Sequence, residues 1–146
     1  MWESLNQYID PEDASYSDAR RGALAHLGDY AAQIVGPLNL RPRAAALHSS
    51  SNTRIEARIS TASSHILLVL APEGDLAAEV AWLRALNSTT LPVPRLIAHD
   101  LSLSAIPFSY AIESYISGAP LDWVAEAPRV RVLARQVGRT LRRSHQ

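Results

Sequence analysis

Three segments of the chain space their apolar residues as amphipathic helices do. They are residues 17–35, a stretch that begins at Gly74-Asp75, and a last stretch that begins at Pro128. Ser17 or Asp18 is suited to cap the first helix, and Gly36-Pro37 ends it. In the last helix the residues expected to face inward are Val130, Leu133, Val137 and Leu141.

Between the helices lie short extended segments, at residues 44–48, 54–60, 66–70, 95–98 and 107–115. The second alternates polar and apolar residues, as a half-buried strand does, and a polar turn, SSSNT, precedes it. The third has no polar interruption, so we expect a central strand covered on both faces. The order predicts an α+β fold, with a small and mainly antiparallel sheet of roughly five strands and flanking helices. Residues 1–16 are expected to form a loose lead-in.

Composition narrows the possible functions. With 146 residues a single domain is expected, and a formal net charge of zero gives no reason to expect nucleic-acid binding. All 14 basic residues are arginine, so no lysine is available for phosphate contact or Schiff-base chemistry. The absence of cysteine excludes thiolate chemistry, and the five histidines lack the paired spacing of a metal site. No apolar run is long enough to span a membrane, and the acidic N-terminus does not resemble a signal peptide, so a cytoplasmic location is expected.

The last helix carries six arginines and no acidic residue. A nucleic-acid patch is one interpretation, but the aromatic residues that would stack on bases are missing there. A solvated or partner-facing helix surface is the interpretation we prefer.

Several short motifs follow one another between about residue 40 and residue 146. They are Ser51-Asn52 in the polar turn, LLVLAPEG, Glu79 in AAEVAWLRAL, LPVPRLIAHD, PFSYAIESYISGAPL and GRTLRRSH. In this order and spacing they resemble the N-terminal lobe of the aminoglycoside phosphotransferase and choline kinase family. Members of that family are kinase-like enzymes that phosphorylate small-molecule hydroxyls with ATP. The resemblance implies a protein-kinase-like N-terminal lobe over residues 17–146.

The resemblance also implies a set of nucleotide-binding residues. Ser50, Ser51 and Asn52 would offer amides and hydroxyls to phosphate, although a simple polar hairpin turn explains them equally well. The backbone carbonyl of Ser114 and the backbone amide of Ile116 occupy the hinge positions that meet adenine in the family.

Glu79 stands at the helix glutamate of the family, whose partner is a cation on the third strand. That position is Val69 here, and the nearest cations along the chain are Arg58 and Arg84. Glu79 is therefore expected to lack an obvious partner, and a solvated acid in the first helical turn is the alternative. ATP is expected to bind weakly, mainly through the hinge.

The family's catalytic base and metal-binding aspartate follow the position where this sequence ends, so no catalytic or metal-binding residue is predicted, and Mg²⁺ is expected only with a second lobe. The predicted function is the nucleotide-binding lobe of a small-molecule kinase, truncated and inactive as an isolated chain. A bare cleft face with Trp123, Val130 and Leu133 is expected to bind that second lobe or to self-associate. The alternative is a non-catalytic binding module that retains the lobe fold.

Overall fold

A computed structural model describes the backbone of residues 1–118 and 127–144, and side chains up to residue 118 and over residues 132–143. Its centre is a five-stranded antiparallel sheet in the order β1-β2-β3-β5-β4. The strands are β1 (Ala44–Ser50), β2 (Ile55–Ser60), β3 (His65–Ala71), β4 (Leu96–Asp100) and β5 (Ser109–Ser114). The chain thus adopts the predicted α+β fold, and β3 is the middle strand, as its unbroken apolar run indicated.

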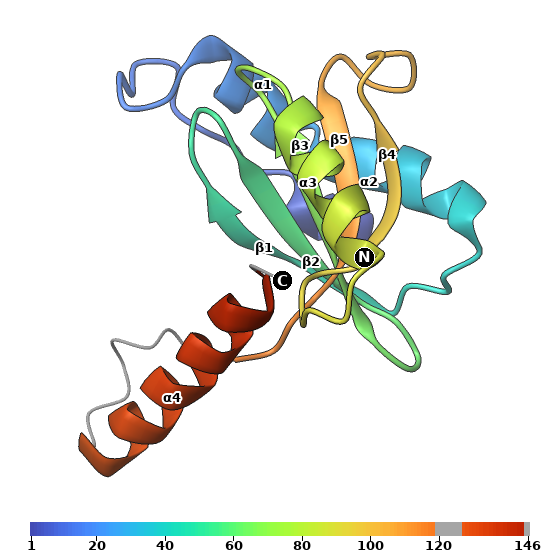
Figure 1. The fold of residues 1–146 in the computed structure, drawn as a ribbon. Helices are drawn as coiled ribbons and strands as arrows, with labels where there is room; N and C mark the ends of the chain where they lie inside the picture. The colour runs from blue at the N-terminus through green and yellow to red at the C-terminus, as the bar shows by residue number, and fades with distance from the viewer. Residues whose placement is uncertain (119–126, 145–146) are drawn as a thin grey trace.

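Helices cover both faces of this sheet (Figure 1). On one face lie the 3₁₀ helix η1 (Trp2–Leu5), α1 (Asp18–Ala25) and α2 (Leu27–Val35), followed by a short turn η2 (Gly36–Leu38). On the other face lies α3 (Ala77–Asn87), and its residue Val80, together with Leu76 directly before the helix, packs against β3 and β5. The last described helix, α4 (Ala127–Ser144), projects away from the sheet (Figure 1).

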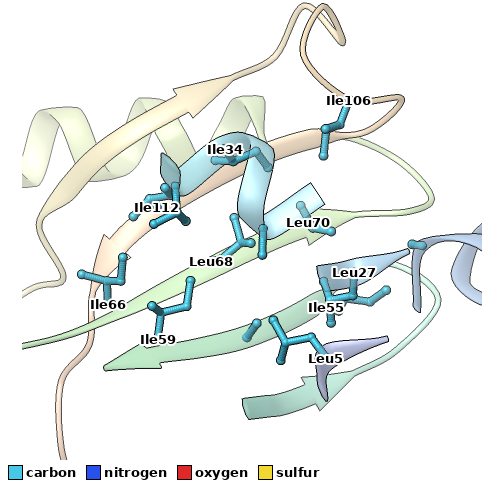
Figure 2. Packing of buried hydrophobic residues seen from close by; sticks show 14 of the residues in the cluster. Leu5, Leu27, Ile34, Ile55, Ile59, Ile66, Leu68, Leu70, Ile106 and Ile112 are labelled. Carbon is cyan, nitrogen blue, oxygen red and sulfur yellow. The ribbon is translucent and has the colours of Figure 1, made fainter. Parts of the chain in front are cut away.

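The larger core lies between the sheet and the N-terminal helices (Figure 2). Alternate residues of each central strand enter it, such as Ile55 and Ile59 from β2 and Leu68 from β3. Because side chains alternate along a strand, the neighbouring residues of β2 and β3 must point toward α3 instead. This alternation decides which side chains are left for a functional site.

Two features of the N-terminal region differ from the sequence-based expectation. The helix expected over 17–35 is two helices, because His26 (φ −119°, ψ 18°) interrupts it between α1 and α2. The expectation of a loose lead-in is also wrong, since Leu5 in η1 is fully buried in the larger core. The Ser17 cap is confirmed: its hydroxyl accepts a hydrogen bond from the Arg20 amide at 3.2 Å.

Of the residues expected to face inward in the last helix, Leu133 is partly buried, whereas the expectation is wrong for Val137 and Leu141. In α4 the side chains of Val137 and Leu141 are 50% and 57% exposed. Trp123 and the side chain of Val130 lie outside the described residues. Among the described helices, none has both the length and the apolar character needed to cross a bilayer.

Gly28 allows η1 to lie directly on α2. A Cβ atom at this position would be 2.1 Å from the Trp2 carbonyl oxygen and 2.9 Å from Oδ1 of Asn6, which accepts a hydrogen bond from the Gly28 amide. Gly28→Ala should therefore lower the free energy of unfolding by about 1–3 kcal/mol, the usual effect of overpacking. Urea denaturation measures it.

Gly22→Ala is the matched control. Gly22 lies inside α1, and no atom is within 4 Å of a Cβ added there. Alanine should stabilise that helix by up to about 1 kcal/mol. Equal effects of the two substitutions would mean that η1 is not packed on α2 in solution.

Candidate functional site

The sheet face that carries α3 bears charged side chains where the helix does not cover it. In β2, Ile55, Ala57 and Ile59 are fully buried in the larger core. Arg54, Glu56 and Arg58, which alternate with them, consequently point to the α3 side. This charged side of β2 is the candidate site.

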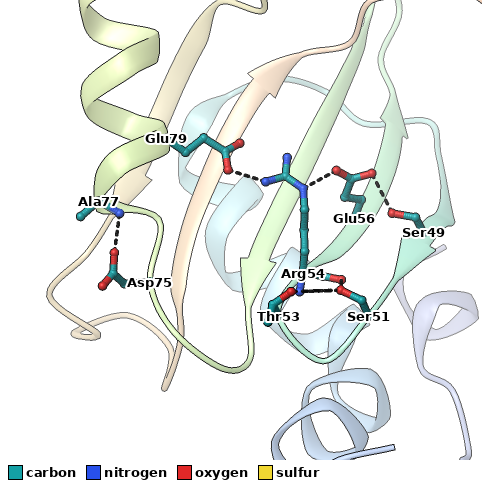
Figure 3. A network of polar contacts seen from close by, with 8 residues as sticks. All are labelled: Ser49, Ser51, Thr53, Arg54, Glu56, Asp75, Ala77 and Glu79. Carbon is teal, nitrogen blue, oxygen red and sulfur yellow. Dashed lines mark hydrogen bonds and ion pairs between the residues drawn. The ribbon is translucent and has the colours of Figure 1, made fainter. Parts of the chain in front are cut away.

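Arg54 joins β2 to α3 (Figure 3). Its Nε atom donates to Oε1 of Glu56 at 2.5 Å, and its Nη1 atom donates to Oε2 of Glu79 on α3. Glu56 in turn accepts a hydrogen bond from the Ser49 hydroxyl at 2.8 Å. One guanidinium therefore holds two carboxylates, and through them it links β1, β2 and α3.

These contacts set the protonation of the network. Burial alone would raise the pKa of Glu56 and of Glu79, but the hydrogen bonds and the charge of Arg54 outweigh it, so the pKa of each carboxyl is lowered. Burial works to lower the pKa of Arg54, and the hydrogen bonds to Glu79 and Glu56 raise it above its ordinary value. All three groups are ionised at neutral pH.

A third carboxyl, that of Glu113 in β5, adjoins this network. It is only 4% exposed, and its Oε1 atom has no partner among the described residues. Burial, followed by the hydrogen bond and the negative charge of Glu79, raises the pKa of Glu113 to about 7. Glu113 therefore keeps its proton below neutral pH and shares it with the ionised Glu79.

At the other end of the sheet the chain leaves β5 through a cluster of rings. The Arg58 guanidinium lies 5.7 Å from the centre of the Tyr115 ring. The rings of His48 and His65 meet that ring edge-on, with centres 5.6 and 6.2 Å away. Ile116, the next residue, is 55% exposed.

Ser114 fixes β4 beside β5. Its amide donates to the Arg95 carbonyl at 2.9 Å, and its hydroxyl accepts from the Arg95 amide at 2.8 Å. Among the described residues, no backbone hydrogen bond is found for the Ile116 amide. The exit from β5 thus has one amide that the described backbone does not use.

The polar turn between β1 and β2 is tied to the protein itself. Arg20 of α1 donates to the carbonyl and to the hydroxyl of Ser50, at 2.9 and 2.8 Å. The Ser51 amide donates to the Arg54 carbonyl at 2.7 Å, and the Asn52 side chain accepts from the Ser17 amide at 3.4 Å. These contacts stabilise a hairpin turn, and a role of the three residues in phosphate binding stays a prediction.

Comparison with known proteins places this arrangement in a family. The model of the phosphotransferase enzyme family (APH) matches residues 44–146, more than half of the chain. The chain belongs to the phosphotransferase enzyme family. No protein in a search of curated sequences matches it.

A solved structure resembles the fold. It is that of a candidate aminoglycoside phosphotransferase from Ralstonia eutropha JMP134, with 18% sequence identity and a TM-score of 0.49. The match covers 69% of this chain and 32% of that one, so this chain spans about a third of the length of the solved protein.

The partner of Glu79 differs from the sequence-based expectation. Val69, the expected position of the strand cation, is fully buried against Leu76 and Val80. Glu79 nevertheless has a partner, because Arg54 reaches it from the neighbouring strand. The expectation that Glu79 lacks a partner, with Arg58 and Arg84 as the nearest cations, is wrong. Distance along the chain was the wrong measure, since β2 and β3 are adjacent in the sheet.

Sequence reasoning also missed Glu56 and Glu113. The alternation in β2 places Arg54 and Glu56 two residues apart, hence on one face, and this signal was present in the sequence. Glu113 is the single acid in the otherwise uncharged strand SYAIES, a pattern that marks a buried polar group for inspection. Within the described residues, no group of three His, Cys, Asp or Glu side chains is arranged to hold a metal ion.

The buried proton of Glu113 makes stability depend on pH. The pKa of this carboxyl is 4.5 ordinarily and about 7 in the folded protein, so its stabilising effect is full below pH 4.5 and is lost as pH rises through 7. Glu113→Gln keeps a neutral group there at every pH. Relative to this variant, the wild type should lose up to about 3 kcal/mol of unfolding free energy between pH 4.5 and pH 8. Chemical denaturation at a series of pH values measures it.

Glu73→Gln provides the control, because Glu73 is an exposed carboxyl in the turn before α3. The free energy of unfolding of the Glu73→Gln variant should change with pH in parallel with that of the wild type. Parallel curves for Glu113→Gln and the wild type would show that Glu113 is not the group that holds the proton.

Proposed function

We propose that this chain is the nucleotide-binding lobe of an ATP-dependent phosphotransferase that acts on a hydroxyl of a small molecule. The observation that carries the proposal is the ion pair between Arg54 and Glu79, which joins the β1–β2 hairpin to α3 and leaves both side chains partly exposed. Phosphoryl transfer depends on positioning and on charge stabilisation, and a cation held by a helix carboxylate supplies both for a triphosphate. Membership of the phosphotransferase family supports the reaction class.

The adenine end of the proposed site is the exit from β5. The Ser114 carbonyl and the Ile116 amide would form the hydrogen bonds to the base. Ile116 is exposed and lies outside β5, so its amide is not used in the strand ladder.

The isolated 146-residue chain is expected to bind nucleotide weakly and not to turn it over. Turnover needs a base and carboxylates that hold Mg²⁺, and the family resemblance expects these in a second lobe. An assay of ATP hydrolysis with Mg²⁺ and a panel of aminoglycosides and amino alcohols should match a no-protein control. Turnover well above that control would contradict this part of the proposal.

Binding through the hinge can be tested by removing one backbone donor. Ile116→Pro deletes the amide hydrogen, and Ile116→Val retains it with a similar side chain. If the amide meets the base, proline should weaken adenosine binding about three- to tenfold, whereas valine should leave it unchanged. Isothermal titration calorimetry measures both, with thermal unfolding as a check on folding. No adenosine binding by the wild type would refute the nucleotide-binding function and favour a non-catalytic interaction module.

The exposed apolar residues of α4 lead to a prediction about association. Val132 and Val137 are 54% and 50% exposed, as expected for a surface that meets a partner. We expect the chain to self-associate or to bind a separately supplied second lobe. Light scattering coupled to size exclusion should show a mass that rises with concentration. Val137→Glu should reduce this association, whereas a monomer at every concentration would mean that α4 has no such role.

A further inference from the structure

We propose that Arg54, the residue directly before β2, is the phosphate-binding cation of this lobe, in place of the cation missing from β3. The inference rests on the proposed nucleotide function and adds to it the residue that receives the phosphates. This role of Arg54 is supported by the register of the sheet, by its unused donor atom and by the charges around it.

The register places Arg54 close to Val69, which stands where the family carries its strand cation. Glu56 lies directly opposite Val69 in the β2–β3 pairing, and Arg54 is two residues away from Glu56 on the same face. Adjacent strands are about 4.8 Å apart, a gap that an arginine side chain spans easily. Arg54 thus reaches the α3 carboxylate that a cation at position 69 would meet.

Arg54 has donors left for a ligand. Its Nε and Nη1 atoms bind the two carboxylates, and Nη2 donates to no atom in the described part of the chain. The side chain is 34% exposed, so solvent and ligands can reach it. Because the two carboxylates fix the guanidinium through Nε and Nη1, they hold the two N–H groups of Nη2 in a set direction, which suits a charge-assisted contact with phosphate oxygens.

The distance along β2 fits a nucleotide. Arg58, beside the ring of Tyr115, is four residues from Arg54, which corresponds to about 13 Å along an extended strand. This span is comparable with an extended nucleoside triphosphate. A base near Tyr115 and Ile116 would therefore bring its phosphates to Arg54.

The carboxylates around Arg54 should affect how tightly it binds phosphate. Glu56 and Glu79 are both ionised, so together they place two negative charges beside one positive charge. Phosphate must compete with these carboxylates for the guanidinium. Glu79 holds the cation toward α3, whereas Glu56 lies on the same strand and acts mainly as a competitor. Removal of the Glu56 charge should consequently strengthen phosphate binding.

The test compares ATP with adenosine in the intact 146-residue chain by isothermal titration calorimetry. The wild type should bind ATP roughly tenfold or more tightly than adenosine, the gain expected of a charge-assisted hydrogen bond. Arg54→Met should bring ATP to the affinity of adenosine and leave adenosine unchanged. Glu56→Gln should strengthen ATP binding severalfold without changing adenosine. Arg84→Met, which removes an exposed arginine that contacts His99, should alter neither.

Two further outcomes separate the hypotheses. In one outcome, adenosine binds, and the wild type and Arg54→Met bind ATP with equal affinity. That result would overturn the role of Arg54 and leave the nucleotide function intact. If the wild type binds neither ATP nor adenosine, the nucleotide function itself is overturned. If Arg54→Met does not fold, Glu56→Gln together with Arg54→Lys decides: ATP affinity unchanged in Glu56→Gln and in Arg54→Lys would refute the proposal.

Discussion

The contact on which the charged face of this structure depends is the guanidinium of Arg54 between Glu56 and Glu79. Among the described residues it is the ion pair that ties α3 to the β1–β2 hairpin, and beside it Leu76 and Val80 make an apolar contact with Val69 and Ala111. Partly buried carboxylates without a cation would resist ionisation, and the helix would lose a fixed orientation relative to β2. The polar turn before β2 contributes, because the Ser51 hydroxyl accepts from the Arg54 amide at 3.0 Å and so fixes the start of the strand.

Charge on this face is balanced by a proton as well as by a cation. Three carboxyls, those of Glu56, Glu79 and Glu113, lie around one guanidinium. Full ionisation would leave two uncompensated negative charges in a partly dry region. Protonation of Glu113, the most buried of the three, removes one of them and provides a hydrogen bond to Glu79. Arginine suits the central position, because its planar guanidinium carries five N–H donors in fixed directions and can hold two carboxylates while several donors stay unused.

The sequence allowed the framework to be predicted, and it failed where contacts cross between strands. Alternation in β2 and the unbroken run in β3 are local signals, and both strands are found where those signals lie. The helix expected over 17–35 broke at His26, and the burial of Leu5 was missed, because each depends on packing between distant segments. The partner of Glu79 was missed for the same reason. Arg54 is 25 residues away in the chain but faces Glu79 once β2 and β3 pair.

In the proposed site the phosphate-binding cation stands at the start of β2 instead of on β3, so it is linked to a different part of the sheet. On β3, a cation would be carried by the most buried strand and would link the helix to the centre of the sheet. On β2, it follows directly after the polar turn and shares a hairpin with Ser49, which holds the second carboxylate. Val69, freed of a charge, packs tightly under α3 with Val80. The apolar contact thus anchors the helix at β3 while the ionic contact ties it to the hairpin. In the proposed site, a phosphate group on Arg54 would therefore act on the turn, the hairpin and α3 together.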